Sequence, residues 1–299
     1  LMELIDQKKP TFIYSLHNAG FGGCYWYLTD GDEALYKALY RQPALEKVPL
    51  HLGEPEAPYC EEFYPGMYRM LGVTAQYDYL EKFVPDKDPA TMITSGTSSD
   101  EYANREGKII SRALVNEMPY FYDQRIDDTT PSDMIRREAV LINCDQTEAF
   151  FAALTPLYER VKPLIHTWNP FFISVEDRMA SSSVGNMDAK RQWAMAPEFE
   201  EKATVAQKFE NLYGQGFYRN LSVCLLWRAC TYELEHGTDM SDAARAELEA
   251  IKADAGKLME ENLRYLEENL HYQAIPIQKL VRIQLASGLL YAKYVHDKN

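Results

Sequence analysis

Apolar residues recur at three- and four-residue steps through the last hundred residues of the chain. In 241–271 the apolar positions include Leu248, Ile251, Ala255, Leu258 and Leu266, and the residues between them are largely charged. This spacing places apolar side chains on one face of a helix and leaves the other face to solvent. The pattern predicts helices over 198–213, 216–236, 241–271 and 276–297.

The pattern is less regular before residue 198. Thr11–Leu16 alternates in the manner of a short strand. Helical spacing is present at 32–40, 61–84, 109–118, 131–143 and 147–164. The last of these segments contains Pro156, which removes a backbone hydrogen bond and should kink the helix. Two stretches, 41–60 and 169–196, show no clear period, and we expect irregular structure there.

Short turns between consecutive helices favour antiparallel neighbours. We therefore predict a mainly α fold of antiparallel helical hairpins, either a bundle or a short helical array. At most one or two short strands are expected, near the N-terminus. The sequence also predicts one continuous globular unit with two parts. Residues 1–165 form an aromatic, loop-rich helical part, and residues 198–299 form a regular part of helical hairpins.

Composition narrows the range of partners. The 299 residues include 31 Lys and Arg and 45 Asp and Glu, so the net charge is −14. Such an acidic surface repels phosphate backbones and anionic lipids, so we expect neither nucleic acid nor membrane insertion. No apolar run has the length of a membrane span or a signal peptide, which predicts a cytoplasmic protein. This localisation assumes that Met2 is the natural start, because residue 1 is Leu.

Metal sites and cofactors are not predicted. The cysteines stand at 24, 60, 144, 224 and 230, without the close pairs that structural zinc sites use. Two Glu-x-x-His patterns, at 233–236 and 268–271, resemble the paired ligands of di-iron bundles. Their predicted positions lie roughly 40 Å apart at 1.5 Å per helical residue, too far for one metal pair. We therefore expect reduced thiols and no metal.

A cysteine-dependent hydrolase or transferase is one functional hypothesis. Cys24 follows two glycines, and a cysteine at a helix start has a lowered pKa because the free N–H groups carry partial positive charge. His166 would then be its base and Asn169 the group that orients the base. His17 and His51 are alternative bases. Residues 21–26 resemble the GGCFW motif of A-type peptide methionine sulfoxide reductases, but the other motifs of that family are absent, and we do not assign the chain to it.

The other hypothesis is a binding protein. The chain contains 21 tyrosines, whose apolar rings and polar hydroxyls suit pockets and interfaces. We predict a Tyr-rich surface that recognises a protein segment or a small polar ligand. Its candidate residues are His17, Tyr25, Trp26, Tyr64 and Tyr68. In the alternative interpretation, these tyrosines fill layers between helices.

Overall fold

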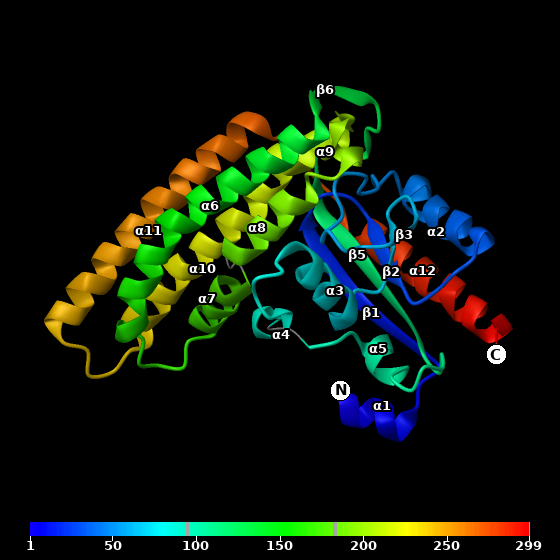
Figure 1. The fold of residues 1–299 in the computed structure, drawn as a ribbon. Coiled ribbons are helices and arrows are strands. Elements are labelled where there is room, and N and C mark those ends of the chain that lie inside the picture. The colour runs from blue at the N-terminus through cyan, green and yellow to red at the C-terminus, as the bar shows by residue number, and fades with distance from the viewer. Residues whose placement is uncertain (94–95, 182–183, 299) are drawn as a thin grey trace. The chain divides into compact units, whose positions relative to one another are not determined.

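The computed structural model of the protein describes residues 1–93, 96–181 and 184–298. The chain divides into two compact units (Figure 1). Unit 1 comprises residues 1–134, 202–210 and 271–299, and unit 2 comprises residues 135–201 and 211–270. The N-terminal segment and the last helix therefore belong to the same unit. The stretch between the two predicted parts, 165–197, lies inside unit 2.

A mixed β-sheet is the centre of unit 1. In the described residues it has six strands in the order β1-β5-β2-β4-β3, and β8 pairs with the end of β5. β1 is parallel to β5, and β2 is antiparallel to β5 but parallel to β4. The strands of this sheet are β1 (Phe12–Phe21), β2 (Tyr25–Leu28), β3 (Glu62–Tyr64), β4 (Met67–Arg69), β5 (Arg112–Tyr122) and β8 (Gln273–Ala274). β6 (Pro131–Ile135) and β7 (Lys202–Thr204) pair separately.

Helices α2 (Glu33–Glu46) and α12 (Ile277–Lys298) pack against one face of this sheet. Side chains alternate along β2, so Trp26 and Leu28 enter this core while Tyr25 and Tyr27 reach the opposite face. The Trp26 indole is fully buried and donates to Ser287 Oγ on α12 at 3.1 Å. The other helices of unit 1 are α1 (Met2–Lys8), α3 (Val73–Phe83), α4 (Pro89–Met92), α5 (Ser99–Ala103) and α9 (Val205–Phe209).

The mixed sheet shows that the predicted mainly α fold of helical hairpins is wrong. Residues 109–118 were expected to be helical, but they contribute to β5, a strand that has neighbours on both sides. A strand with two buried faces reads as a continuous apolar run, and a short run of this kind does not distinguish strand from helix. The prediction for 61–84 fails in its first part, because β3 and β4 precede α3.

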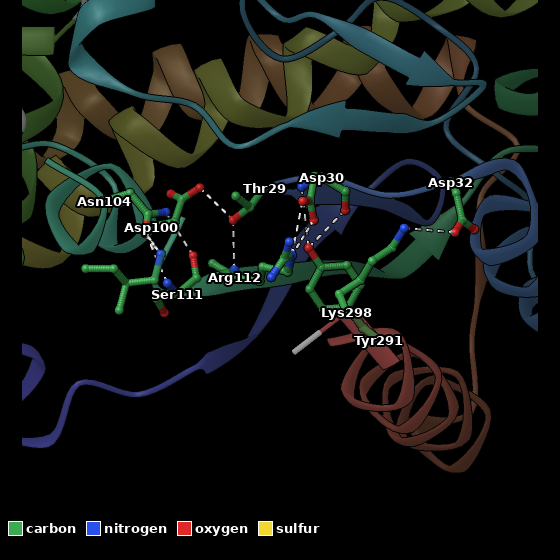
Figure 2. Close-up of polar contacts among 11 residues, drawn as sticks. Thr29, Asp30, Asp32, Asp100, Asn104, Ser111, Arg112, Tyr291 and Lys298 are labelled. Carbon is green, nitrogen blue, oxygen red and sulfur yellow. Dashed lines mark hydrogen bonds and ion pairs between the residues drawn. The ribbon is translucent and has the colours of Figure 1, made fainter. Parts of the chain in front are cut away.

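Polar contacts fix the end of the sheet where β2 finishes and β5 begins (Figure 2). Arg112 Nε donates to both carboxylate oxygens of Asp30, at 2.9 and 3.0 Å. The hydroxyl of Tyr291 on α12 donates to the Asp30 carbonyl at 3.0 Å. Thr29 Oγ1 donates to Asp100 at 2.7 Å. These groups are one another's partners, and the network therefore connects β2, β5, α5 and α12.

Unit 2 is built from helices. Its long helix α10 packs against α6, α7 and α11. The bounds are α6 (Arg136–Val161), α7 (Pro170–Ser181), α8 (Val184–Trp193), α10 (Gln215–His236) and α11 (Asp242–Asn269). The helices predicted over 216–236, 241–271 and 276–297 are thus present as α10, α11 and α12. The segments 131–143 and 147–164 form the strand β6 and one helix, α6, which contains Pro156.

Two further expectations need correction. The stretch 169–196 contains the helices α7 and α8 instead of irregular structure. The helix predicted over 198–213 is a 3-10 turn at Pro197–Glu200, then β7, α9 and a π-helical turn at Glu210–Gly214. Within the described ranges, no helix combines the length and the apolar character that crossing a bilayer requires.

Candidate functional site

An ion pair joins the two parallel strands β1 and β5. His17 and Glu117 are register partners, and His17 Nδ1 lies 2.9 Å from Glu117 Oε1. His17 is the sixth of the ten residues of β1, and Glu117 is the sixth of the eleven residues of β5, so the pair lies near the middle of both strands. The contact between an exposed imidazole and a largely buried carboxylate makes the pair the strongest candidate for a functional site in unit 1.

The two side chains of this pair differ in exposure. The imidazole of His17 is 53% exposed, whereas the carboxylate of Glu117 is 10% exposed. Burial raises the pKa of the Glu117 carboxyl above its ordinary value, and the nearby charge of Glu56 raises it further. The charge of His17 and its hydrogen bond oppose this shift in pKa. A carboxyl group with a raised pKa beside an exposed imidazole is suited to proton transfer.

A second carboxylate is held near Glu117 by tyrosines of β2. The hydroxyl of Tyr27 donates to Glu56 Oε2 at 2.8 Å, and the hydroxyl of Tyr25 reaches the same oxygen at 3.3 Å. Tyr25 is also the register partner of Glu117 across β2 and β5. Tyr68 on β4 packs against both tyrosine rings, at centroid distances of 6.4 and 5.8 Å. These rings form a buried cluster, and the hydroxyl groups of Tyr25 and Tyr27 position the Glu56 carboxylate.

The glycines before Cys24 allow a close approach between two backbone segments. A Cβ atom on Gly23 would lie 2.2 Å from the backbone nitrogen of His51 and from the carbonyl carbon of Leu50. Cys24 forms an isolated parallel bridge with Leu50, and its N–H donates to the Pro49 carbonyl at 2.8 Å. The glycines therefore have a packing role, and Cys24 precedes a strand instead of beginning a helix.

Cys24 lies in the core of unit 1. Its side chain is fully buried, and burial raises the pKa of its thiol well above the ordinary value. Asn116 Nδ2 lies 4.0 Å from the sulfur. His166 and Asn169 belong to unit 2, where the N–H of His166 donates to Glu233 and Asn169 caps the start of α7. These contacts do not favour the predicted Cys24 nucleophile with His166 and Asn169.

The predicted binding residues are divided between the two faces of the sheet. His17, Tyr25 and Tyr68 belong to the face that carries the ion pair and the tyrosine cluster. Trp26 and Tyr64 lie on the opposite side, where Trp26 is buried and Tyr64 stacks on Tyr36 of α2. Only His17 of these five residues is largely exposed. The structure thus brings together three of the five candidates.

Metal binding at the pair would need more ligands. An imidazole nitrogen and a carboxylate oxygen are both zinc donors, but a zinc centre takes at least three protein ligands. Among residues that the structure describes, no group of three His, Cys, Asp or Glu side chains is arranged to hold a metal. A cavity of about 960 Å³ in unit 1 is lined by residues such as Tyr40, Leu50 and Asp127, and it does not include the pair.

Sequence reasoning missed Glu117, Glu56 and Tyr27. Glu117 was missed because 109–118 was predicted to be a helix. Its pairing with His17 also depends on two strands about one hundred residues apart in sequence. The run Ala113–Val115, bounded by Gly107 and Pro119, was the available strand signal. No local sequence pattern marks Glu56 as a site residue, because the tyrosines that contact it belong to β2, which is distant in sequence.

Comparisons with known proteins give no functional assignment. No protein-family model matches the chain, and no significant match to a curated protein or a solved structure was found.

Proposed function

We propose that unit 1 carries an acid–base site and that the protein is an enzyme acting on a small polar molecule or a protein segment. The observation that supports this is the 2.9 Å contact between the exposed His17 imidazole and the largely buried Glu117 carboxylate, on adjacent parallel strands. The proposal retains part of the predicted Tyr-rich recognition surface. Of its predicted residues, Tyr25 lies beside the pair, and its hydroxyl and that of the neighbouring Tyr27 contact Glu56.

Hydrolysis is the reaction class that fits these groups most simply. Glu117 has a raised pKa and accepts a proton from water, so that the oxygen can attack a carbonyl carbon. The proton then passes to the leaving group. His17 has the exposed side chain, and it contacts the substrate and holds it beside the carboxylate. A general base of this kind typically contributes about a hundredfold to ten-thousandfold in rate.

The test is a hydrolysis screen with p-nitrophenyl acetate and a set of dipeptide amides. We expect Glu117→Gln to reduce kcat by about a hundredfold or more. His17→Gln should mainly raise KM. Glu106→Gln, which changes an exposed carboxylate of the same unit, is the matched control and should leave turnover unchanged.

Unfolding midpoints of the variants establish that the fold is retained. Full turnover by Glu117→Gln, or no hydrolysis of any compound by the unaltered chain, would contradict the proposal.

A further inference from the structure

A cavity of about 960 Å³ lies in unit 1 and does not include the His17–Glu117 pair. Its lining residues come from the second half of α2, from segment 47–52, from the end of β5 and from residues 124–128. Pockets that bind small molecules have volumes of roughly 300–1,000 Å³, so this cavity is near the upper end of that range. It therefore has room for a ligand larger than a single amino acid.

One part of the cavity lining is apolar. Val48 and Leu50 are buried and belong to the core against which α2 packs. Leu52 and the rings of Tyr40 and Tyr122 pack against the same core and also line the cavity. Apolar side chains of a ligand gain free energy when they leave water for such a wall. The apolar lining thus favours a ligand with apolar side chains.

Two side chains of opposite charge line the cavity and are not paired with each other. Lys47 follows the last residue of α2, and Asp127 ends the turn Gln124–Asp127. Among the residues that the structure describes, neither side chain has a hydrogen-bond or ion-pair partner on another residue. A ligand with both an ammonium and a carboxylate group offers a partner to each, whereas a ligand of one sign would be repelled by one of them.

The other charged side chains of the lining already have partners. Arg125 donates to both carboxylate oxygens of Asp123, from Nε at 2.9 Å and from Nη2 at 2.7 Å. Asp128 accepts from the N–H of Thr130 at 2.9 Å and from its hydroxyl at 2.6 Å. Within the described part of the chain, the cavity therefore offers a ligand one carboxylate and one ammonium group.

Two neutral polar groups of the lining are also available. The hydroxyl of Tyr40 and the side-chain amide of Gln124 have no hydrogen-bond partner in the described ranges. A side-chain amide both donates and accepts, so it can bond to the C=O and the N–H of a peptide bond. A free amino acid has no peptide bond and would leave these groups unused. The polar lining therefore matches a peptide better than a single amino acid.

We propose that this cavity binds a short peptide of about two or three residues, with free ends and apolar side chains. The ammonium group of the peptide pairs with Asp127, and its terminal carboxylate pairs with Lys47. The peptide bond meets the two neutral polar groups, and the side chains lie against the apolar part of the lining. The site is separate from the proposed acid–base chemistry, because neither His17 nor Glu117 lines the cavity.

The probe is the dipeptide leucyl-leucine, and its binding is measured by isothermal titration calorimetry. We expect the unaltered chain to bind it with a dissociation constant of about 1 mM or lower. The N-acetylated dipeptide lacks the ammonium group, and the C-terminal amide lacks the carboxylate. Each of these two compounds should bind about tenfold more weakly, because a hydrogen bond to a charged group is lost.

Two variants show which end of the peptide each residue contacts. Asp127→Asn should weaken binding of the free dipeptide and of its amide by about tenfold, and it should leave the affinity for the acetylated form unchanged. Lys47→Gln should weaken binding of the free dipeptide and of the acetylated form, and it should leave the affinity for the amide unchanged. This crossed pattern arises only if each residue pairs with the stated end.

Asp86→Asn and Lys87→Gln are the matched controls, because they change exposed residues of unit 1 outside the cavity. Both variants should bind leucyl-leucine as the unaltered chain does. Glu117→Gln should also bind it normally, so this test and the hydrolysis screen can fail independently. Unfolding midpoints of all variants show whether a loss of binding is a loss of structure.

Three results would overturn the proposal. One is the absence of leucyl-leucine binding to the unaltered chain at concentrations up to about 10 mM. Another is equal affinity for the free, acetylated and amidated dipeptides, because the two charged ends would then make no contact. The third is binding of free leucine as tight as that of leucyl-leucine, which would identify a single amino acid as the ligand.

Discussion

Replacing Tyr27 with Phe tests whether tyrosines hold the Glu56 carboxylate in place. The substitution removes one hydroxyl group and keeps the ring, which is 5% exposed and packs against Tyr25 and Tyr68. The hydroxyl donates to Glu56 Oε2 at 2.8 Å. Packing is therefore preserved, and the change removes this charge-assisted hydrogen bond together with the weak 3.9 Å contact between the hydroxyl and Cys60 Sγ.

The expected cost follows from that geometry. A hydrogen bond to a charged group contributes about 1.5–3 kcal/mol, so Tyr27→Phe should lower the free energy of unfolding by about 2 kcal/mol. Tyr25→Phe should cost less, about 1 kcal/mol, because its oxygen lies 3.3 Å from the same acceptor. In a Glu56→Gln background the Tyr27 effect should shrink, giving a coupling energy of about 1 kcal/mol or more.

The assay must report on unit 1 alone, because a chain with two compact units need not unfold in one step. Trp26 is the tryptophan of unit 1, and Trp168, Trp193 and Trp227 belong to unit 2. Fluorine NMR of 5-fluorotryptophan therefore follows unit 1 through the Trp26 resonance during urea titration. A coupling energy below about 0.5 kcal/mol would refute the interpretation that Tyr27 positions Glu56.

Three further predictions concern the same unit. Burial raises the pKa of Glu117, so the stability that its bound proton contributes is present at low pH and is lost as pH rises through the folded-state pKa. The urea midpoint should therefore fall between pH 4 and pH 8, and Glu117→Gln should make this fall smaller. An unchanged fall in the variant would contradict the prediction. Cys24 is buried and its thiol pKa is raised, so iodoacetamide at neutral pH should label it at least about tenfold more slowly in the folded chain than in urea. Rapid labelling of the folded chain would instead support the hypothesis that Cys24 is a nucleophile. Gly23→Ala should lower the free energy of unfolding by about 3 kcal/mol, because the added Cβ would overlap rigid backbone. At Gly107 the φ angle is 79°, but an added Cβ would have no atom within 4 Å, so Gly107→Ala should lower the free energy of unfolding by only about 1 kcal/mol in the same urea titration. Equal losses of stability in the two variants would show that the backbone overlap at Gly23 does not matter.

Local periodicity predicted those parts of the fold that depend on local interactions. The helices α10, α11 and α12 have long apolar stripes, and Ser241 caps α11 by accepting from the Ala244 N–H, so their positions could be predicted from the sequence. The sheet could not, because its order joins β1 to β5 across some one hundred residues. A buried strand and a short buried helix have similar composition, and only the partners of a strand decide between them.

The candidate site was predicted in part for the same reason. His17 was named because histidine is chemically versatile, and Tyr25 because aromatic residues gather after it. The carboxylates Glu117 and Glu56 acquire their significance from three-dimensional neighbours, which no sequence spacing expresses. The glycines at 22 and 23 suggested a reactive cysteine, yet Gly23 allows a close backbone contact with Leu50 and His51, and Gly22 lies against the His51 ring.

The tyrosine excess has a physical explanation in the β2 cluster. Glu56 is exposed, and phenylalanine could fill the space of the two tyrosine rings without offering a donor to its carboxylate. Tyr25 and Tyr27 supply both a buried ring and a hydroxyl directed at Glu56. The negative charge that they hold then raises the pKa of Glu117 on the neighbouring strand. Tyr25 and Tyr27 therefore fill the cluster and, through Glu56, also raise the proton affinity of Glu117. In this way the tyrosine content of the chain contributes to the proposed acid–base site.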